Sequence, residues 1–122
     1  MDIKKEVTKF LVDYGFPTKL NGYQYTRECL CMILNGTMPP TNKIMFSEVA
    51  EKFQSDSENV ERCLETVVNQ MWKTMSYTKL FPTKPTIRMF LTRCAEYISL
   101  DANRPRSAYD ILLEPDNPSE VS

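Results

Sequence analysis

The residues best suited to chemistry lie in the stretch SENVERCLETVVNQMW, which runs from Ser57 to Trp72. Helical spacing gathers its apolar side chains on one side and leaves a polar face on the other. The candidates for contacts to nucleic-acid bases or backbone are Glu58, Asn59, Glu61, Arg62, Glu65, Thr66 and Asn69. An arginine can make a bidentate contact to guanine, an asparagine can pair with adenine, and a glutamate can accept a hydrogen bond from the cytosine amino group. This chemistry predicts guanine for Arg62, adenine for Asn59 or Asn69, and cytosine for Glu61.

The net charge of this stretch argues against such contacts. From Asp56 to Asn69 the chain holds four acidic residues and Arg62, for a net charge of −3. A helix of this sign loses the gain from counterion release that supplies most nonspecific affinity for DNA. An unpaired carboxylate in a groove costs about 1 to 3 kcal/mol, which is comparable to a wrong base contact. A solvated acidic face is therefore the competing interpretation.

Basic residues are concentrated later in the chain. Residues 1–69 carry a net charge of −2, residues 70–106 carry +5, and the last sixteen residues hold four acids and no base. Attraction for a polyanion therefore comes mainly from the third quarter of the chain. We expect phosphate contacts from Lys43, and from Lys84 and Arg88 near the start of the last helix, where the helix dipole adds to the attraction. The alternative is an ordinary solvated basic face.

The elements that position these residues are predicted from apolar spacing and from helix-ending residues. A first amphipathic helix begins near Ile3 and stops at Gly15 and Pro17. Asn21 is placed to cap a second helix, which ends at Asn35 and Gly36. The stretch MPPTNK that follows is predicted to be a connection.

A predicted short helix over 46–53 is followed by the polar break QSDS and by a longer helix over about 57–74. Ser55 and Glu58 have the spacing of a capping box that opens the longer helix. The core face of that helix is predicted from the spacing of Val60, Leu64, Val67, Met71 and Met75. This order of elements is that of a helix-turn-helix, although two ordinary antiparallel core helices give the same spacing.

The rest of the chain is predicted to be a loop, one more helix and a tail. The stretch TKLFPTKPT reads as an ordered loop, and Thr86 is placed to cap a last helix whose inner residues are Ile87, Phe90, Leu91, Cys94 and Ile98. No strand alternation is present, so the expected fold is an all-α bundle of about five helices over residues 1–100. Residues 101–122 are expected to form an acidic, Pro-containing tail, in which SAYDILL forms one apolar turn that docks on a partner or on the domain.

Composition excludes several classes of function. The chain contains no histidine, and Cys29, Cys31, Cys63 and Cys94 do not have the spacing of a zinc site. We read the cysteines as buried thiols and expect no catalytic residue, no metal and no cofactor, so the protein is not expected to be an enzyme. Without a bilayer-spanning apolar run or a signal-peptide stretch, we also expect a soluble, cytoplasmic protein with no membrane partner.

The order of several short segments is similar to that of one known family. These are LVDYGFP after the first helix, GYQYTRECLCMIL, VAEKF, VERCLE with Trp72 closing its helix, and KPT followed by Phe90. Together they span about residues 3–100 and resemble the C-terminal DNA-binding effector domain of the master response regulator of endospore formation. The resemblance implies a helix-turn-helix domain whose recognition helix, about 57–74, enters the major groove. It also implies tandem binding of two domains to repeated sites and contact with RNA polymerase.

The chain departs from the family pattern at several positions. Glu61 and Arg62 agree with the family, whereas Asn59 and Glu65 stand where the family is basic and Thr66 stands where it has histidine. The stretch 73–82 is shorter than in the family, which predicts that a short helix associated with polymerase contact is reduced or missing. A receiver domain does not fit in the 122 residues, so we expect no phosphorylation control of the usual kind. The chain is then either a piece of a longer protein or a stand-alone relative.

Two functions remain open on these grounds. The first is a DNA-binding transcription regulator domain of the sporulation type, with double-stranded DNA as its partner and a homodimer or tandem dimer as its assembly. The second is a protein-interaction module that keeps the fold and has lost DNA reading, for example a modulator that pairs with a full-length regulator.

Overall fold

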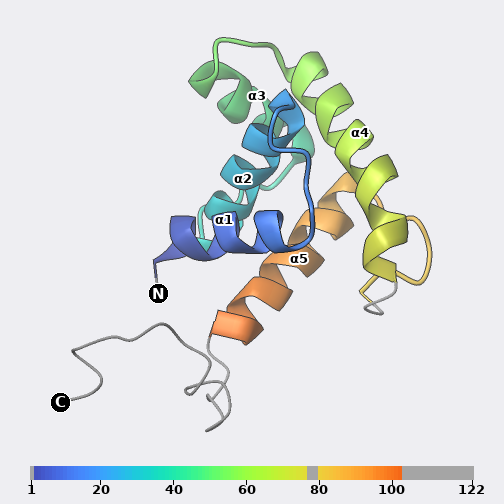
Figure 1. Ribbon diagram of the computed structural model, residues 1–122. Coiled ribbons are helices and arrows are strands. Elements are labelled where there is room, and N and C mark those ends of the chain that lie inside the picture. Colours follow the sequence, from blue (N-terminus) through green and yellow to red (C-terminus); the bar gives the residue numbers. More distant parts are fainter. Residues whose placement is uncertain (1, 77–79, 103–122) are drawn as a thin grey trace, which may run out of the picture.

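The computed structural model describes residues 2–76 and 80–102. Five helices account for most of them, and these residues include no strand. The helices are α1 (Ile3–Asp13), α2 (Asn21–Leu34), α3 (Asn42–Lys52), α4 (Ser57–Ser76) and α5 (Ile87–Ala102) (Figure 1). The predicted all-α bundle of about five helices is confirmed, and α2 is its centre because it contacts each of the other four helices.

The close approach of α2 and α4 depends on a glycine. A Cβ atom added at Gly22 would lie 2.6 Å from Cγ2 of Val67 and 3.0 Å from the backbone oxygen of Cys63. One turn later on α2, the buried Thr26 hydroxyl donates a 2.6 Å hydrogen bond to the Gly22 carbonyl, which satisfies this polar side chain inside the core. Glycine therefore lets the recognition-helix candidate pack directly on the central helix.

The inner faces predicted for the last two helices are confirmed. On α4, Val60, Leu64, Val67, Met71 and Met75 are at most 5% exposed. On α5 the five predicted inner residues, from Ile87 to Ile98, are all buried. A core stripe at helical spacing orients each helix, so the opposite side of α4 must face away from the bundle.

Two helix starts differ from the prediction. Asn21 is the first residue of α2 rather than its N-cap, which is Leu20 and forms no side-chain capping bond. Helix α3 begins at Asn42 instead of Phe46, because the Thr41 hydroxyl accepts a 3.2 Å hydrogen bond from the Ile44 N–H. MPPTNK is therefore a connection only as far as Thr41.

The start of α4 is capped by Asp56, so the capping box predicted from Ser55 is wrong. Oδ1 of Asp56 accepts a 2.8 Å hydrogen bond from the Asn59 N–H, and the helix begins at Ser57. Ser55 instead accepts a bond from the Asn59 side chain. The Thr86 cap of α5 is confirmed, since its hydroxyl accepts from the Met89 N–H at 3.2 Å.

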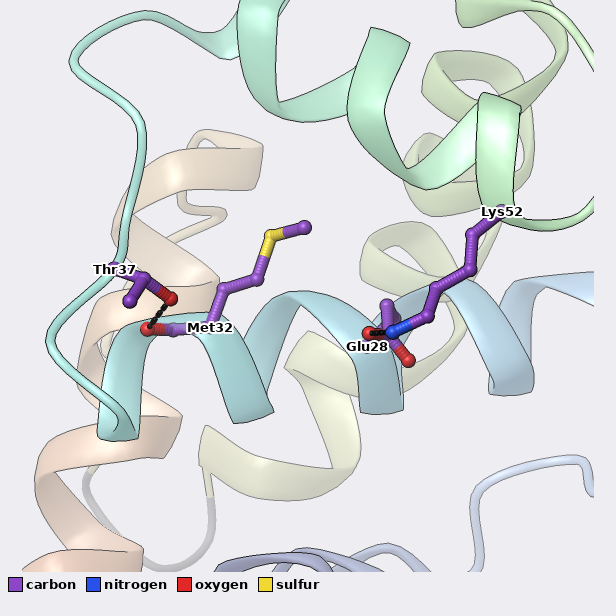
Figure 2. A network of polar contacts seen from close by, with 4 residues as sticks. All are labelled: Glu28, Met32, Thr37 and Lys52. Atoms are coloured by element: carbon purple, nitrogen blue, oxygen red, sulfur yellow. Dashed lines mark hydrogen bonds and ion pairs between the residues drawn. The ribbon is translucent and has the colours of Figure 1, made fainter.

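The ends of the first three helices use left-handed residues. Gly15 and Gly36 have φ values of 74° and 76°, as the predicted breaks require. After α2 the Thr37 hydroxyl also donates to the Met32 carbonyl at 3.2 Å (Figure 2). After α3 and its C-cap Phe53, Gln54 has a φ of 54°, a conformation that a side chain with a Cβ disfavours.

The cysteines are free thiols, and two of them are fully enclosed. Cys29 and Cys94 are buried, as predicted, whereas Cys31 and Cys63 are only half-buried. Burial raises the pKa of the Cys29 thiol to about 12 and raises that of Cys94 as well, so both stay protonated at neutral pH. Within residues 2–76 and 80–102 no group of three His, Cys, Asp or Glu residues is placed to hold a metal ion.

Two predictions fall partly outside the described residues. Helix α5 continues to Ala102, and the remainder of the predicted tail, 103–122, lies outside them. In the shortened stretch after α4, residues 77–79 also lie outside, and residues 80–86 form no helix. None of the helices in the described part of the chain is both long and apolar enough to cross a bilayer.

Candidate nucleic-acid interface

Helices α3 and α4 form a helix-turn-helix with a four-residue turn, 53–56. The aromatic ring of Phe53 packs against Tyr25 of α2, with the ring centroids 5.5 Å apart. Lys52, in the last turn of α3, forms an ion pair with Glu28 of α2 (Figure 2). Both contacts hold the end of α3 on the central helix, so the shorter helix is a fixed support for α4.

The predicted outer face of α4 points away from the bundle. Its exposed residues are Glu58, Glu61, Arg62, Thr66 and Asn69, while Asn59 and Glu65 are half-buried. The Thr66 hydroxyl donates to the backbone carbonyl of Arg62 at 3.0 Å, which turns its oxygen back onto the helix. The exposed part of this face therefore offers a guanidinium, two carboxylates and an amide to a partner.

Arg62 is connected to the core through Asn59. Oδ1 of Asn59 accepts a hydrogen bond from the Arg62 guanidinium at 2.5 Å. The amide nitrogen of Asn59 donates to the Ser55 hydroxyl at 2.9 Å and to the hydroxyl of Tyr25 at 3.4 Å. Because the Tyr25 side chain is only 3% exposed, this chain of bonds orients the guanidinium from inside the protein.

The orienting role of Asn59 was not recognised from the sequence, which predicted a base contact for it. A local signal was present, because Ser55, Asn59 and Arg62 are spaced at i, i+4 and i+7, which brings side chains together on a helix. Tyr25 is 34 residues away, so no spacing rule finds it. With its amide occupied on three sides, Asn59 is better suited to hold Arg62 than to pair with adenine.

A cleft of about 700 Å³ lies beside α4, where the N-terminal parts of α3 and α4 meet the residues around the start of α5. Its lining comprises Asn42, Lys43 and Phe46 of α3, Ser57, Glu58, Glu61 and Glu65 of α4, and residues 84–87 at the start of α5. It brings together five of the predicted contact residues, Lys43, Glu58, Glu61, Glu65 and Lys84. Arg62 lies outside it and lines a second hollow of about 500 Å³ with the 54–56 turn. Thr66, Asn69 and Arg88 line neither hollow.

Of the predicted loop TKLFPTKPT, the structure describes residues 80–86, and these are anchored to the core at two points. Phe81 is 1% exposed and stacks on Phe90 with ring centroids 5.1 Å apart, and Pro85 is also buried. Between these anchors Lys84 reaches across the cleft, and its Nζ lies 3.0 Å from Oε1 of Glu65. Two residues that were predicted to contact DNA separately are thus paired with each other.

Arg88 is occupied within the domain. Its guanidinium donates 3.0 Å hydrogen bonds to Oδ1 of Asn42 and to the carbonyl oxygen of Pro39, and the side chain is half-buried. These contacts pin the connection before α3 to the first turn of α5. Arg88 therefore positions the N-terminus of α3, and its prediction as a phosphate contact remains untested.

A supporting helix fixed on a central helix, a four-residue turn and a second helix with a free polar face define a helix-turn-helix domain of the DNA-binding class. The match to known families agrees with this class. Residues 7–98 match the family described as Sporulation initiation factor Spo0A C terminal, which covers most of the chain. The chain belongs to this family, a family of DNA-binding regulatory domains.

Proposed function

We propose that this domain binds double-stranded DNA as a transcription regulator, with the outer face of α4 in the major groove. The observation that carries the proposal is the Arg62 guanidinium, exposed on α4 and held by Asn59 through bonds that begin at the buried Tyr25. An arginine whose orientation is already fixed loses less conformational freedom when it makes a bidentate contact to guanine. The family membership supports the same function.

The other predicted contacts have separate roles in this proposal. Glu61 and Asn69 are exposed on α4 and face base edges, with Thr66 between them. Lys43 is exposed in the first turn of α3, where the helix dipole adds to its attraction for phosphate. The domain would work in the cytoplasm, where a regulator meets bacterial DNA, either alone or as a tandem dimer on repeated sites.

The test is a comparison of specific and nonspecific binding. A duplex selected from a random pool with the wild-type domain, and a scrambled duplex, are titrated at several salt concentrations. Arg62→Ala should weaken binding to the selected duplex by about 1 to 3 kcal/mol and change binding to the scrambled duplex much less. Asn59→Ala should reproduce part of that loss, because it frees the guanidinium without removing it.

Arg93→Ala is the matched control, since Arg93 is an exposed arginine that belongs to a different helix, α5. If selection at low salt enriches no duplex, or if Arg62→Ala and Arg93→Ala lower affinity equally on both duplexes, α4 does not read DNA.

A second function is favoured by the net charge of −3 between Asp56 and Asn69. In that case the domain is an interaction module that pairs with a second copy, with a full-length regulator or with RNA polymerase. Sizing of the purified domain alone, and with a full-length regulator, decides between the two functions. A stable complex that survives Arg62→Ala, together with no DNA binding, supports the interaction module.

A further inference from the structure

The ion pair between Lys84 and Glu65 lies at the edge of the proposed interface. Lys84 projects from the loop anchored by Phe81 and Pro85, and Glu65 projects from α4 into the same cleft. Their side chains are 46% and 45% exposed, and 3.0 Å separates Nζ from Oε1. Both groups are therefore accessible to a partner that enters the cleft.

We propose that Glu65 acts as an internal substitute for a DNA phosphate and withholds Lys84 from the nucleic-acid backbone. The inference rests on the proposed DNA binding and names a residue that sets its strength. A lysine that is already neutralised by a carboxylate presents no net charge to the duplex. It therefore displaces no counterion, and the phosphate contact that Lys84 is placed to make is not formed.

The surroundings of the pair favour this role over that of a stabilising bridge. A pair with both side chains nearly half exposed adds little to folding, because water and salt screen it. Its neighbours in the cleft include Lys43 and the carboxylates of Glu58 and Glu61. Since α4 is already acidic, sequestering one lysine has a large relative effect on the few positive charges that face DNA.

Counterion release makes the effect measurable. Each phosphate that a protein neutralises contributes about −0.9 to the slope of log K against log salt concentration, which amounts to about eightfold in affinity at about 0.1 M salt. Glu65→Gln keeps the size of the side chain and removes its charge, which releases Lys84. The variant should bind a random-sequence duplex about eightfold more tightly at about 0.1 M salt, with a slope steeper by about 0.9.

Three further variants separate release of Lys84 from a simple change of net charge. Glu58→Gln is the matched control, because Glu58 lines the same cleft and, among the described residues, forms no ion pair. It removes the same charge without releasing a lysine, so its slope should stay at the wild-type value. Lys84→Gln alone should also leave the slope unchanged. The double variant Glu65→Gln with Lys84→Gln should lose the whole gain in slope.

The experiment is a fluorescence anisotropy titration of the random-sequence duplex by these five proteins over a range of salt, with thermal unfolding to verify that each is folded. The inference is overturned if Glu65→Gln has the wild-type slope, or if Glu58→Gln steepens the slope as much as Glu65→Gln does. It is also overturned if Lys84→Gln alone makes the slope shallower by about 0.9, the value of one phosphate contact. If no variant binds any duplex, Glu65→Gln included, the proposed function itself fails. If Glu65→Gln is the one variant that binds the duplex more tightly than the wild type, the result supports both the proposed DNA binding and the inference about Glu65.

Discussion

The two faces of α4 differ in what determines the position of their side chains. On the inner face, from Val60 to Met75, position follows from helical spacing and from burial against α2, α3 and α5. On the outer face, the orientation of Arg62 depends on Tyr25, and the pairing of Glu65 depends on Lys84. The arrangement of the inner face thus follows from local spacing, whereas the chemistry of the outer face is set by residues that are distant in the sequence.

The largest expected effect comes from the inner face. Leu64 is 1% exposed, so Leu64→Ala removes buried methyl groups and leaves a cavity that the surrounding helices fill only in part. We expect a loss of about 2 to 5 kcal/mol in the free energy of unfolding, measured by urea denaturation. Thr66→Ala, two residues later on the exposed side, is the control and should change stability by less than about 0.5 kcal/mol. Equal losses would contradict the division of α4 into two faces.

The contact between α2 and α4 is expected to give the next largest effect. Gly22→Ala improves helix propensity, but its Cβ meets Cγ2 of Val67 and the backbone of Cys63, so the two helices must move apart. We expect a net destabilisation of about 1 to 3 kcal/mol. Val67→Ala removes the atom of the shortest contact. In a double-mutant cycle, the double variant should therefore lose less stability than the sum of the losses in the two single variants. Strict additivity would show that Gly22 does not set the spacing of the helices.

Substitutions of Arg88 and Lys84 compare two cations for which the sequence predicted the same role, a contact to phosphate. Arg88→Ala removes the bonds to Asn42 and Pro39, and we expect it to lower the free energy of unfolding by about 1 to 2 kcal/mol. Lys84→Ala removes an exposed ion pair and should lower it by less than about 0.5 kcal/mol. Thermal unfolding of the two variants side by side measures the difference. If Lys84→Ala is the more damaging change, the assignment of a structural role to Arg88 is wrong.

The fold was predictable because its signals are local. Apolar residues at helical spacing located all five helices, and Gly15 and Gly36 marked two of the helix ends. The errors arose where neighbouring residues compete for one role. Ser55 and Asp56 are both good N-cap residues, and only the bond from the Asn59 N–H to Asp56 decides between them. Thr41 was overlooked because two prolines shortly before it suggested a connection.

The candidate site was predictable in its residue types but not in its contacts. Spacing placed seven polar residues of α4 on its outer face, and five of them are exposed there, whereas Asn59 and Glu65 are half-buried. The bonds from Arg88 to Asn42 and Pro39 join residues that are 46 and 49 positions apart in the sequence. Such contacts follow from how α3, α4 and α5 pack. That packing depends on many weak contacts between side chains, which no local sequence pattern reveals.

The smallest expected effect is a stabilisation in the turn that separates the two helices of the motif. Gln54 has φ 54°, and its N–H bonds to the Glu51 carbonyl while the next N–H, of Ser55, bonds to the Ala50 carbonyl at 2.8 Å. Gln54→Gly keeps this helix end and relieves the left-handed strain of about 1 to 2 kcal/mol. Glycine also gives the unfolded chain more freedom, so the expected net gain is about 0.5 to 1 kcal/mol.

Gln54→Ala retains the Cβ and should show no gain, so it serves as the control in the same unfolding measurement. Gln54 lies beside the hollow that Arg62 lines, yet its backbone rather than its side chain fixes the turn. DNA affinity should therefore stay unchanged in Gln54→Gly while stability rises. If DNA affinity and stability changed together, the turn and the outer face of α4 would be coupled. The independence of the two faces of α4 would then not extend to the turn.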